Sequence, residues 1–223
     1  MDKTKAALDT WCSAPDVEFI DKIAESNYKT RAKRIADAIQ LKKPDRVPVI
    51  PCLNMFPALD NGITCEDAMF DYEKTASAWM KTLNDFEPDS YFSPQTAQPG
   101  PALEILQYTS LKLPGRQVPA NHSYQFDEKE VVTAEEFYEG YLSDPSDFMF
   151  RTFLPRVCQS LEPLKELSPL TTMLSYSNGL LEGAMKFGLP HIAEALQTLV
   201  NAGVEIRKFY DHVKAYTKKV QAM

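Results

Sequence analysis

The sequence predicts a helix-rich α/β fold with few strands, because helical and extended patterns alternate along its first half. Residues 28–41 repeat apolar side chains at the spacing of an amphipathic helix. Pro44 disfavours helical geometry in the residue before it, and residues 46–50, which are apolar apart from Arg46, predict a short buried strand. The same order recurs once, with a helix predicted over 72–86 and a strand over 89–93. Helix, break and strand in this order are typical of α/β units and indicate the entry to an α/β barrel.

The lead-in, residues 1–43, is predicted to be helical, with a short pattern near residues 17–24 before the clearer helix. Charged side chains of that helix are expected to fill its solvated face, which we favour over an anion site. These residues are Arg31, Lys33, Arg34 and Asp37.

Capping residues mark the next two helices. Thr64 and Asp71 each offer a side-chain oxygen that can accept from the first backbone N–H groups of a helix. Helix 72–86 carries aromatic and apolar residues at helical spacing, with Trp79 in the middle of the stripe. We therefore expect this stripe to lie in the core.

The second half is predicted to be mainly helical. A helix is expected over 102–108, and a hairpin or extended excursion over 111–126. A capping box opens a helix over 133–142, and from residue 156 onward the pattern is almost entirely helical. The longest helix is predicted over 189–220.

The number of strands is too small for a whole barrel. A complete (β/α)8 TIM-type barrel needs about 250 residues and eight strand–helix units. The chain has 223 residues, and only two barrel-type strands and one hairpin are predicted. We expect one domain over 1–223 that forms an incomplete front section of such a barrel. Strand edges without neighbours would favour self-association.

Composition narrows the classes of partner. The net charge is −7, which disfavours nucleic-acid binding because that needs a basic face. No apolar run approaches the ~18 residues of a membrane span, so no membrane association is expected. Residues 1–5 lack the apolar core of a signal peptide. We expect a cytoplasmic protein.

The cysteines and histidines predict no metal site and no disulfide within the chain. The four cysteines are widely spaced, which suits free thiols in a reducing compartment: Cys12, Cys52, Cys65 and Cys158. No histidine lies two to four residues from a cysteine or another histidine, as zinc ligands commonly do: His122, His191 and His212. Nucleophile elbows, phosphate loops and dinucleotide fingerprints are also absent from the sequence.

The candidate substrate-binding residues follow the two predicted strands, because barrel active sites lie on loops after the carboxyl ends of strands. After the first strand, Asn54 can orient a polar substrate, while Met55 and Phe56 can wall a flat apolar one. After the second, Ser93 and Gln95 occupy the equivalent loop. The alternative is that the apolar pair packs in the core and the amides cap loop backbone.

The Pro-Asp-Arg-Val-Pro-Val motif at residues 44–49, between a charged helix and a loop, resembles the opening of the uroporphyrinogen decarboxylase superfamily. The resemblance implies the N-terminal section of a TIM barrel that acts on tetrapyrroles or corrinoids. The decarboxylases follow the first strand with an arginine-rich loop and the second with Phe-Ser-Asp. Here residues 52–61 contain no arginine, and Phe92-Ser93 is followed by Pro94. Both departures argue against porphyrinogen decarboxylation, since a polyanionic tetrapyrrole needs fixed cations.

The sister branch of the superfamily transfers a methyl group from a methylated corrinoid protein to a thiol-type acceptor that zinc activates. The resemblance favours this methyltransferase reading and implies a corrinoid protein as partner. It places the zinc ligands, a His-x-Cys pair and a distant cysteine, beyond Met223, so we expect the chain to be inactive alone. One alternative is a decarboxylase (a lyase) whose carboxylate-binding arginines have moved, for example to Arg116, Arg151 or Arg156. Another is a non-catalytic interaction protein.

Overall fold

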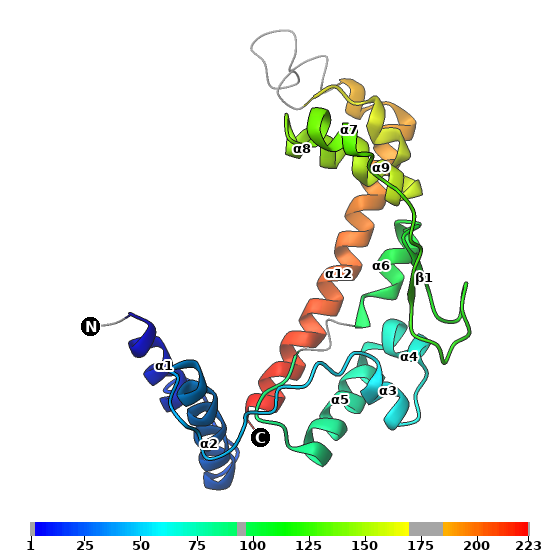
Figure 1. The fold of residues 1–223 in the computed structure, drawn as a ribbon. Helices are drawn as coiled ribbons and strands as arrows, with labels where there is room; N and C mark the ends of the chain where they lie inside the picture. The colour runs from blue at the N-terminus through cyan, green and yellow to red at the C-terminus, as the bar shows by residue number, and fades with distance from the viewer. Residues whose placement is uncertain (1–2, 93–96, 170–184, 223) are drawn as a thin grey trace. The chain divides into compact units, whose positions relative to one another are not determined.

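The computed structural model describes residues 3–92, 97–169 and 185–222, and most of them are helical (Figure 1). The predicted helix-rich class is therefore confirmed. The chain divides into two compact units, which we call the first unit (Met1–Gln98 with Phe209–Met223) and the second unit (Pro99–Lys208). The assignment of 1–223 to a single superfamily domain stays a prediction.

Five helices of the first unit precede residue 87: α1 (Lys3–Ser13), α2 (Lys22–Ile39), α3 (Phe56–Asp60), α4 (Cys65–Phe70) and α5 (Tyr72–Phe86). Helix α2 begins at Lys22 rather than at Tyr28, because the Asp21 side chain caps it by accepting from the Ala24 N–H at 2.7 Å. The predicted caps of the next helices are confirmed. Thr64 forms a capping box at α4, and the Asp71 side chain accepts from the N–H of Lys74 at α5.

Helix α5 supplies the centre of the first unit's apolar core. It spans Tyr72–Phe86 as predicted, and the Trp79 side chain is fully buried. Short helices α3 and α4 pack against α5 through Ala58, Cys65 and Met69, which are also fully buried. The prediction that the α5 stripe forms core is confirmed at Trp79.

The two predicted barrel strands do not form over the described residues, and those predictions were wrong. Residues 46–50 and 89–92 are irregular, with bends at Arg46 and Asp89, and belong to no ladder. They nevertheless touch, because Val49 O accepts from the N–H groups of Asp89 (2.9 Å) and Ser90 (3.4 Å). Pro48 has no N–H, and the Val49 N–H donates to the Asp89 side chain instead of to a neighbouring strand. The prediction of a buried segment was wrong as well, because the Val47, Val49 and Ile50 side chains are exposed.

The second unit is a set of short helical turns and one hairpin. The hairpin predicted over 111–126 is confirmed in reduced form: β1 (Leu111–Lys112) pairs with β2 (Gln125–Phe126) in antiparallel register. The other elements are α6 (Gly100–Ile105), α7 (Ala134–Glu136), α8 (Pro145–Asp147), α9 (Leu154–Val157), π-helical turns at Phe137–Tyr141 and Phe148–Phe153, and a 3-10 helix at Gln159–Glu166.

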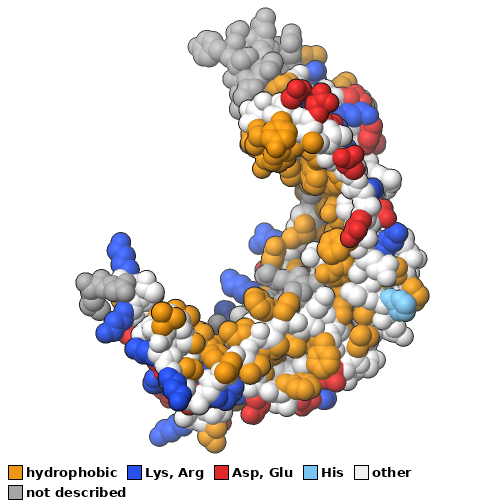
Figure 2. Space-filling view, in the orientation of Figure 1, with side chains coloured by type: hydrophobic (Ala, Val, Ile, Leu, Met, Phe, Trp, Pro, Cys, Tyr) orange, Lys and Arg blue, Asp and Glu red, His pale blue; other side chains and the backbone are white. Residues whose placement is uncertain are grey.

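The core of the second unit is apolar throughout. Its buried residues come from the end of α9, the 3-10 helix and one face of the long helix α12: Val157, Cys158, Leu161, Leu164, Leu167, Ile192 and Ala195. Hydrophobic side chains are also visible on the surface of both units (Figure 2). At about 0.8 kcal/mol per buried methylene, burial of this cluster is the main stabilising contribution of the unit.

Helix α12 (Pro190–Ala222) belongs to both units. Gly203, a residue that could bend or divide the helix, does not interrupt it. Ile192 lies in the core of the second unit, whereas the Phe209 and Tyr216 rings contact Tyr72 and Tyr91 of the first. Within the described residues, no helix combines the length and apolarity needed to cross a membrane.

Candidate functional site

The predicted binding residues lie at the start of α3. Asn54 adopts a left-handed backbone with φ of 43°, which turns the chain into the helix. Met55 is only 4% exposed and is part of the first unit's core, whereas the Phe56 side chain is 45% exposed. Its ring lies 5.7 Å from the Phe86 ring in an edge-on contact. This loop therefore presents Phe56, but not Met55, to a ligand.

The other predicted residues, Ser93 and Gln95, lie outside the described residues. No substrate role of the five predicted residues is tested by these positions, and their assignment stays a prediction.

A buried carboxylate, Asp89, organises the polar interior of the first unit. Arg34 of α2 donates from Nη1 to Asp89 Oδ1. Arg46 donates from Nη1 to Oδ2 at 2.7 Å and from Nη2 to Oδ1 at 2.8 Å. The Val49 N–H donates to Oδ2 at 2.8 Å. Four donors from two distant segments therefore satisfy one fully buried carboxylate.

Arg34 also holds Asp45 of the Pro-Asp-Arg break. Its Nε and Nη2 donate to the two Asp45 carboxylate oxygens at 2.7 and 2.6 Å, a bidentate pair. The hydrogen bonds from Arg34 lower the pKa of Asp45 to about 2, and the Asp45 hydrogen bonds raise the pKa of Arg34. We call Arg34, Asp45, Arg46 and Asp89 the Asp89 network. With two cations and two anions it is balanced in charge, and it joins α2 to the segments that contain Asp45 and Asp89.

The structure corrects one sequence prediction here. Arg34 was expected on the solvated face of the lead-in helix, but it is only 7% exposed. A signal was present in the sequence, because a Pro-Asp dipeptide stands at the beginning of each irregular segment, at residues 44–45 and 88–89. Two acids at matching places in the two segments point to a shared buried cation.

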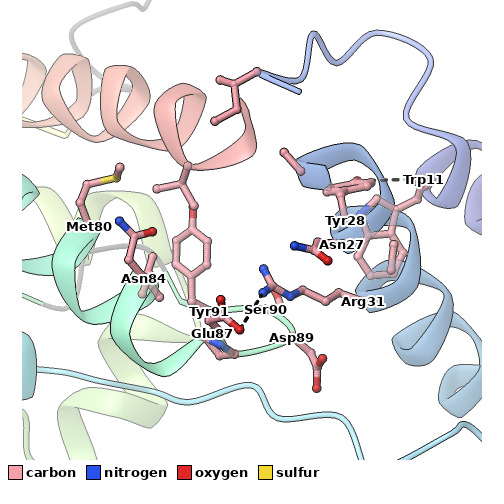
Figure 3. A pocket seen from close by; sticks show the side chains of 16 residues that line it. Trp11, Asn27, Tyr28, Arg31, Met80, Asn84, Glu87, Asp89, Ser90 and Tyr91 are labelled. Carbon is pink, nitrogen blue, oxygen red and sulfur yellow. Dashed lines mark hydrogen bonds and ion pairs between the residues drawn. The ribbon is translucent and has the colours of Figure 1, made fainter. Parts of the chain in front are cut away.

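A cavity of about 590 Å³ lies beside the Asp89 network, between α2 and α5 (Figure 3). We call it the α2–α5 cavity. Its walls include large aromatic and apolar side chains from α1, α2, α5, α12 and the segments beside them, together with several polar groups: Trp11, Ile20, Ala24, Asn27, Tyr28, Arg31, Ala32, Met80, Leu83, Asn84, Glu87, Pro88, Asp89, Ser90, Tyr91 and Val220. The volume lies within the ~300–1,000 Å³ range of small-molecule sites.

The aromatic walls of the cavity are held in place by contacts outside it. The Tyr28 hydroxyl donates to the backbone oxygen of Trp11 at 3.2 Å, which joins α2 to α1. On the other side, the Tyr91 ring packs edge-on against the buried Tyr216 ring of α12, at 6.3 Å between centroids. Burial raises the pKa of both the Tyr91 and the Tyr216 hydroxyls, so both remain protonated at neutral pH.

Polar groups of the cavity have unused hydrogen-bonding capacity. Asn27 extends from α2 and Asn84 from α5, and neither side-chain amide has a hydrogen-bond partner among the described residues (Figure 3). Arg31 lies near Glu87, with 4.0 Å between Nη2 and Oε2, at the outer limit of an ion pair. Asn27 and Asn84 were not singled out from sequence, and Arg31 was assigned to the solvated face of its helix, because Asn and Arg on an amphipathic helix are ordinary surface residues.

The thiols and acids do not form a metal site in the part of the chain that the structure describes, where no group of three or more His, Cys, Asp or Glu side chains lies close enough to hold an ion. Cys65 and Cys158 are buried, and burial raises the pKa of both thiols. Cys52 is exposed.

Comparisons with known proteins add no relative. Neither protein-family models, nor curated protein sequences, nor solved structures match this chain. Function is therefore argued from the residues and their geometry.

Proposed function

We propose that the chain is the N-terminal section of a barrel enzyme of the uroporphyrinogen decarboxylase superfamily. The enzyme takes a methyl group from a methylated corrinoid protein and transfers it to a thiol-type acceptor. The observation that supports this proposal is the contact between the segment before α3 and the segment after α5. Val49 O accepts from the N–H of Asp89, forty residues later, after three intervening helices.

A return of this kind is what a strand–helix–strand unit requires. In a parallel unit, the chain leaves one strand, crosses over through a helix and comes back beside the first strand. Residues 46–50 and 89–92 form no strands, but the hydrogen bonds at Val49 place the two segments side by side, as in such a pair. The Asp89 side chain replaces part of the ladder by accepting from the Val49 N–H at 2.8 Å.

The arginines favour methyl transfer over decarboxylation. Arg116 pairs with Glu104, Arg151 with Asp147 and Arg156 with Glu136. A tetrapyrrole carboxylate would have to displace an acid from each of these residues. The chain also has no arginine within residues 52–61, where the decarboxylases carry an arginine-rich loop. Decarboxylation of uroporphyrinogen is therefore the less favoured alternative.

In the proposed reaction, the acceptor thiolate attacks the methyl carbon. A carbon–sulfur bond forms and the cobalt–carbon bond breaks, with its electron pair remaining on the corrinoid. The thiol proton is lost to solvent. The described residues offer no set of zinc ligands, so we assign no thiol-activating step to them. The role proposed for this chain is to bind the corrinoid face through Asn54 and Phe56.

Binding of free methylcobalamin tests this role, with uroporphyrinogen as the competing substrate. We expect a saturable change in the methylcobalamin spectrum, no methyl transfer by the chain alone and no coproporphyrinogen. Phe56→Ala should weaken the binding, whereas Leu59→Ala, an equally exposed residue of α3, should not. Coproporphyrinogen above the uncatalysed background would select the decarboxylase instead.

An interaction protein is the second candidate, favoured by exposed apolar residues around the Pro-Asp-Arg break. Leu41 is 95% exposed and Val47 81% exposed, and Ile39, Val49 and Ile50 are also exposed. Exposed apolar side chains at and beside residues 46–50, which belong to no sheet, favour association with another chain. Light scattering over a range of concentrations would support this candidate if the chain self-associates and binds no corrinoid.

A further inference from the structure

We infer that the α2–α5 cavity binds a planar aromatic carboxylate. The site is separate from the loop proposed for the corrinoid, because neither Asn54 nor Phe56 lines the cavity. It lies wholly within the first unit, since its walls come from residues 11–91 and from Val220. The inference therefore stands or falls independently of the proposed methyl transfer.

The shape and lining of the cavity favour an aromatic ligand. Trp11 and Tyr28 stand on the α2 side, and Met80 and Tyr91 on the α5 side (Figure 3). Aromatic rings and a polarizable thioether on opposing walls provide contacts for both faces of a flat ring system. Trp11 is more than a third exposed despite its size, so ligand binding would bury apolar surface that the free protein leaves in water.

Arg31 selects an anion. Arg34 and Arg46, which also lie near the cavity, already donate hydrogen bonds to Asp45 and Asp89. Arg31 has Glu87 as its acid partner among the described residues, and that contact is 4.0 Å long. The Glu87 side chain is largely exposed, so it can swing away at little cost. A ligand carboxylate can then form the short bidentate pair that Glu87 does not make.

The two unpaired amides provide orientation. Asn27 lies one turn before Arg31 on α2, and Asn84 lies on α5 on the opposite wall. Each offers two donors and one acceptor that have no partner among the described residues. Polar atoms on the ring system, or the second carboxylate oxygen, can bind there. An aromatic acid uses the aromatic, cationic and amide groups together, which a simple aliphatic acid or a neutral arene does not.

The two tryptophans of the chain provide the readout, because one lines the cavity and the other is buried away from it. We would titrate the ¹⁵N-labelled full chain with 2-naphthoate and follow both indole N–H resonances, assigned with Trp11→Phe. The Trp11 resonance should shift saturably, while the Trp79 resonance should stay in place. Naphthalene-2-carboxamide has the same rings without the charge, and it should bind about tenfold more weakly.

Two variants of α2 test the role of Arg31. Arg31→Gln should weaken 2-naphthoate binding by about tenfold and leave the carboxamide unaffected. Lys29→Gln removes the same charge two residues away, from a side chain that pairs with Glu25 and does not line the cavity, so it should bind as the wild type does. Circular dichroism checks that both variants fold.

Three results would overturn the inference. The first is an unmoved Trp11 resonance at saturating 2-naphthoate. The second is equal affinity for 2-naphthoate and its carboxamide, which would show that the negative charge of the ligand does not contribute to binding. The third is an equal loss of affinity in Arg31→Gln and Lys29→Gln, which would show that Arg31 acts through the overall charge of α2 and not through contact with the carboxylate. None of these results depends on whether methylcobalamin binds.

Discussion

The two units of this protein are stabilised at their centres by different kinds of contact. In the first unit, the Asp89 network joins α2 to residues 45–49 and to Asp89 through directional hydrogen bonds centred on a buried carboxylate. In the second unit, seven apolar residues around Leu161 and Leu164 pack without a comparable network among the described residues. A charged centre specifies which segments meet, because each donor needs its own acceptor. An apolar centre depends on filled volume, which many arrangements can supply.

The largest expected effect comes from removing the acid at the centre of the network. Asp89→Ala leaves buried donors without an acceptor, and breaking a buried charge pair in this way costs ~3–5 kcal/mol. Urea unfolding should show this loss, and hydrogen exchange should locate it in the first unit. Asp85→Ala, which removes an exposed acid of α5 paired with Lys81, should unfold as the wild type does. Equal effects of the two variants would show that the network does not stabilise the unit.

The matching change in the second unit is Leu164→Ala. The Leu164 side chain is fully buried, and replacing a buried leucine by alanine costs ~2–5 kcal/mol, depending on how far the cavity collapses. Leu142→Ala, at an exposed position, is the control. Hydrogen exchange should increase in the second unit and not around the Asp89 network. Faster exchange in both units would contradict a division into two differently stabilised regions.

Acid should affect the network before it affects the apolar cluster. The pKa of Asp45 is about 2 in the folded protein, chiefly because Arg34 donates to it, against 3.8 for an unperturbed aspartate. Because the folded-state value is the lower one, the contribution to stability is complete above about pH 4 and is lost as the pH falls through 2. Denaturant unfolding at several pH values should show a shallower acid limb for Asp45→Asn. Asp16→Asn, another exposed acid of this unit, should leave the limb unchanged.

The smallest expected effect concerns two glycines. Gly203 lies within α12 with open space where a Cβ would be, so Gly203→Ala should stabilise the protein by ~0.5–1 kcal/mol. Gly62 has equal space but a φ of 73°, so the same substitution should destabilise there. Thermal melting compares the two variants. The same sign for both would mean that backbone conformation does not decide the outcome.

The elements that sequence predicted best are those with local determinants. Thr64, Asp71 and Thr133 cap helices as expected, because a cap depends on residues within one turn. Trp79 is buried as the periodicity of α5 required. The long helix was predicted nearly to its ends, and Gly203 does not interrupt it. Each of these features is decided by neighbours in the sequence.

The features that sequence predicted poorly depend on distant partners. Residues 46–50 have the composition of a strand, but Asp89 captures the Val49 N–H. Arg34 has the helical position of a surface residue and is buried by two acids that lie far along the chain. The α2–α5 cavity is formed by α2, α5 and the end of α12 together, so the sequence of any one segment could not predict it. Of the predicted site residues, Asn54 and Phe56 are placed where a ligand can reach the loop, and Met55 is not.

The two-part composition of the first unit has a consequence for how the protein is made. Its residues 1–98 leave the ribosome well before Phe209 and Tyr216, whose rings contact Tyr72 and Tyr91. At ordinary translation rates of ~5–20 residues per second, this interval is on the order of 5–20 s. During that time the whole second unit is synthesised, while the first lacks the helix that covers part of its aromatic surface. Until α12 is synthesised, the nascent chain therefore exposes aromatic surface that the finished protein covers.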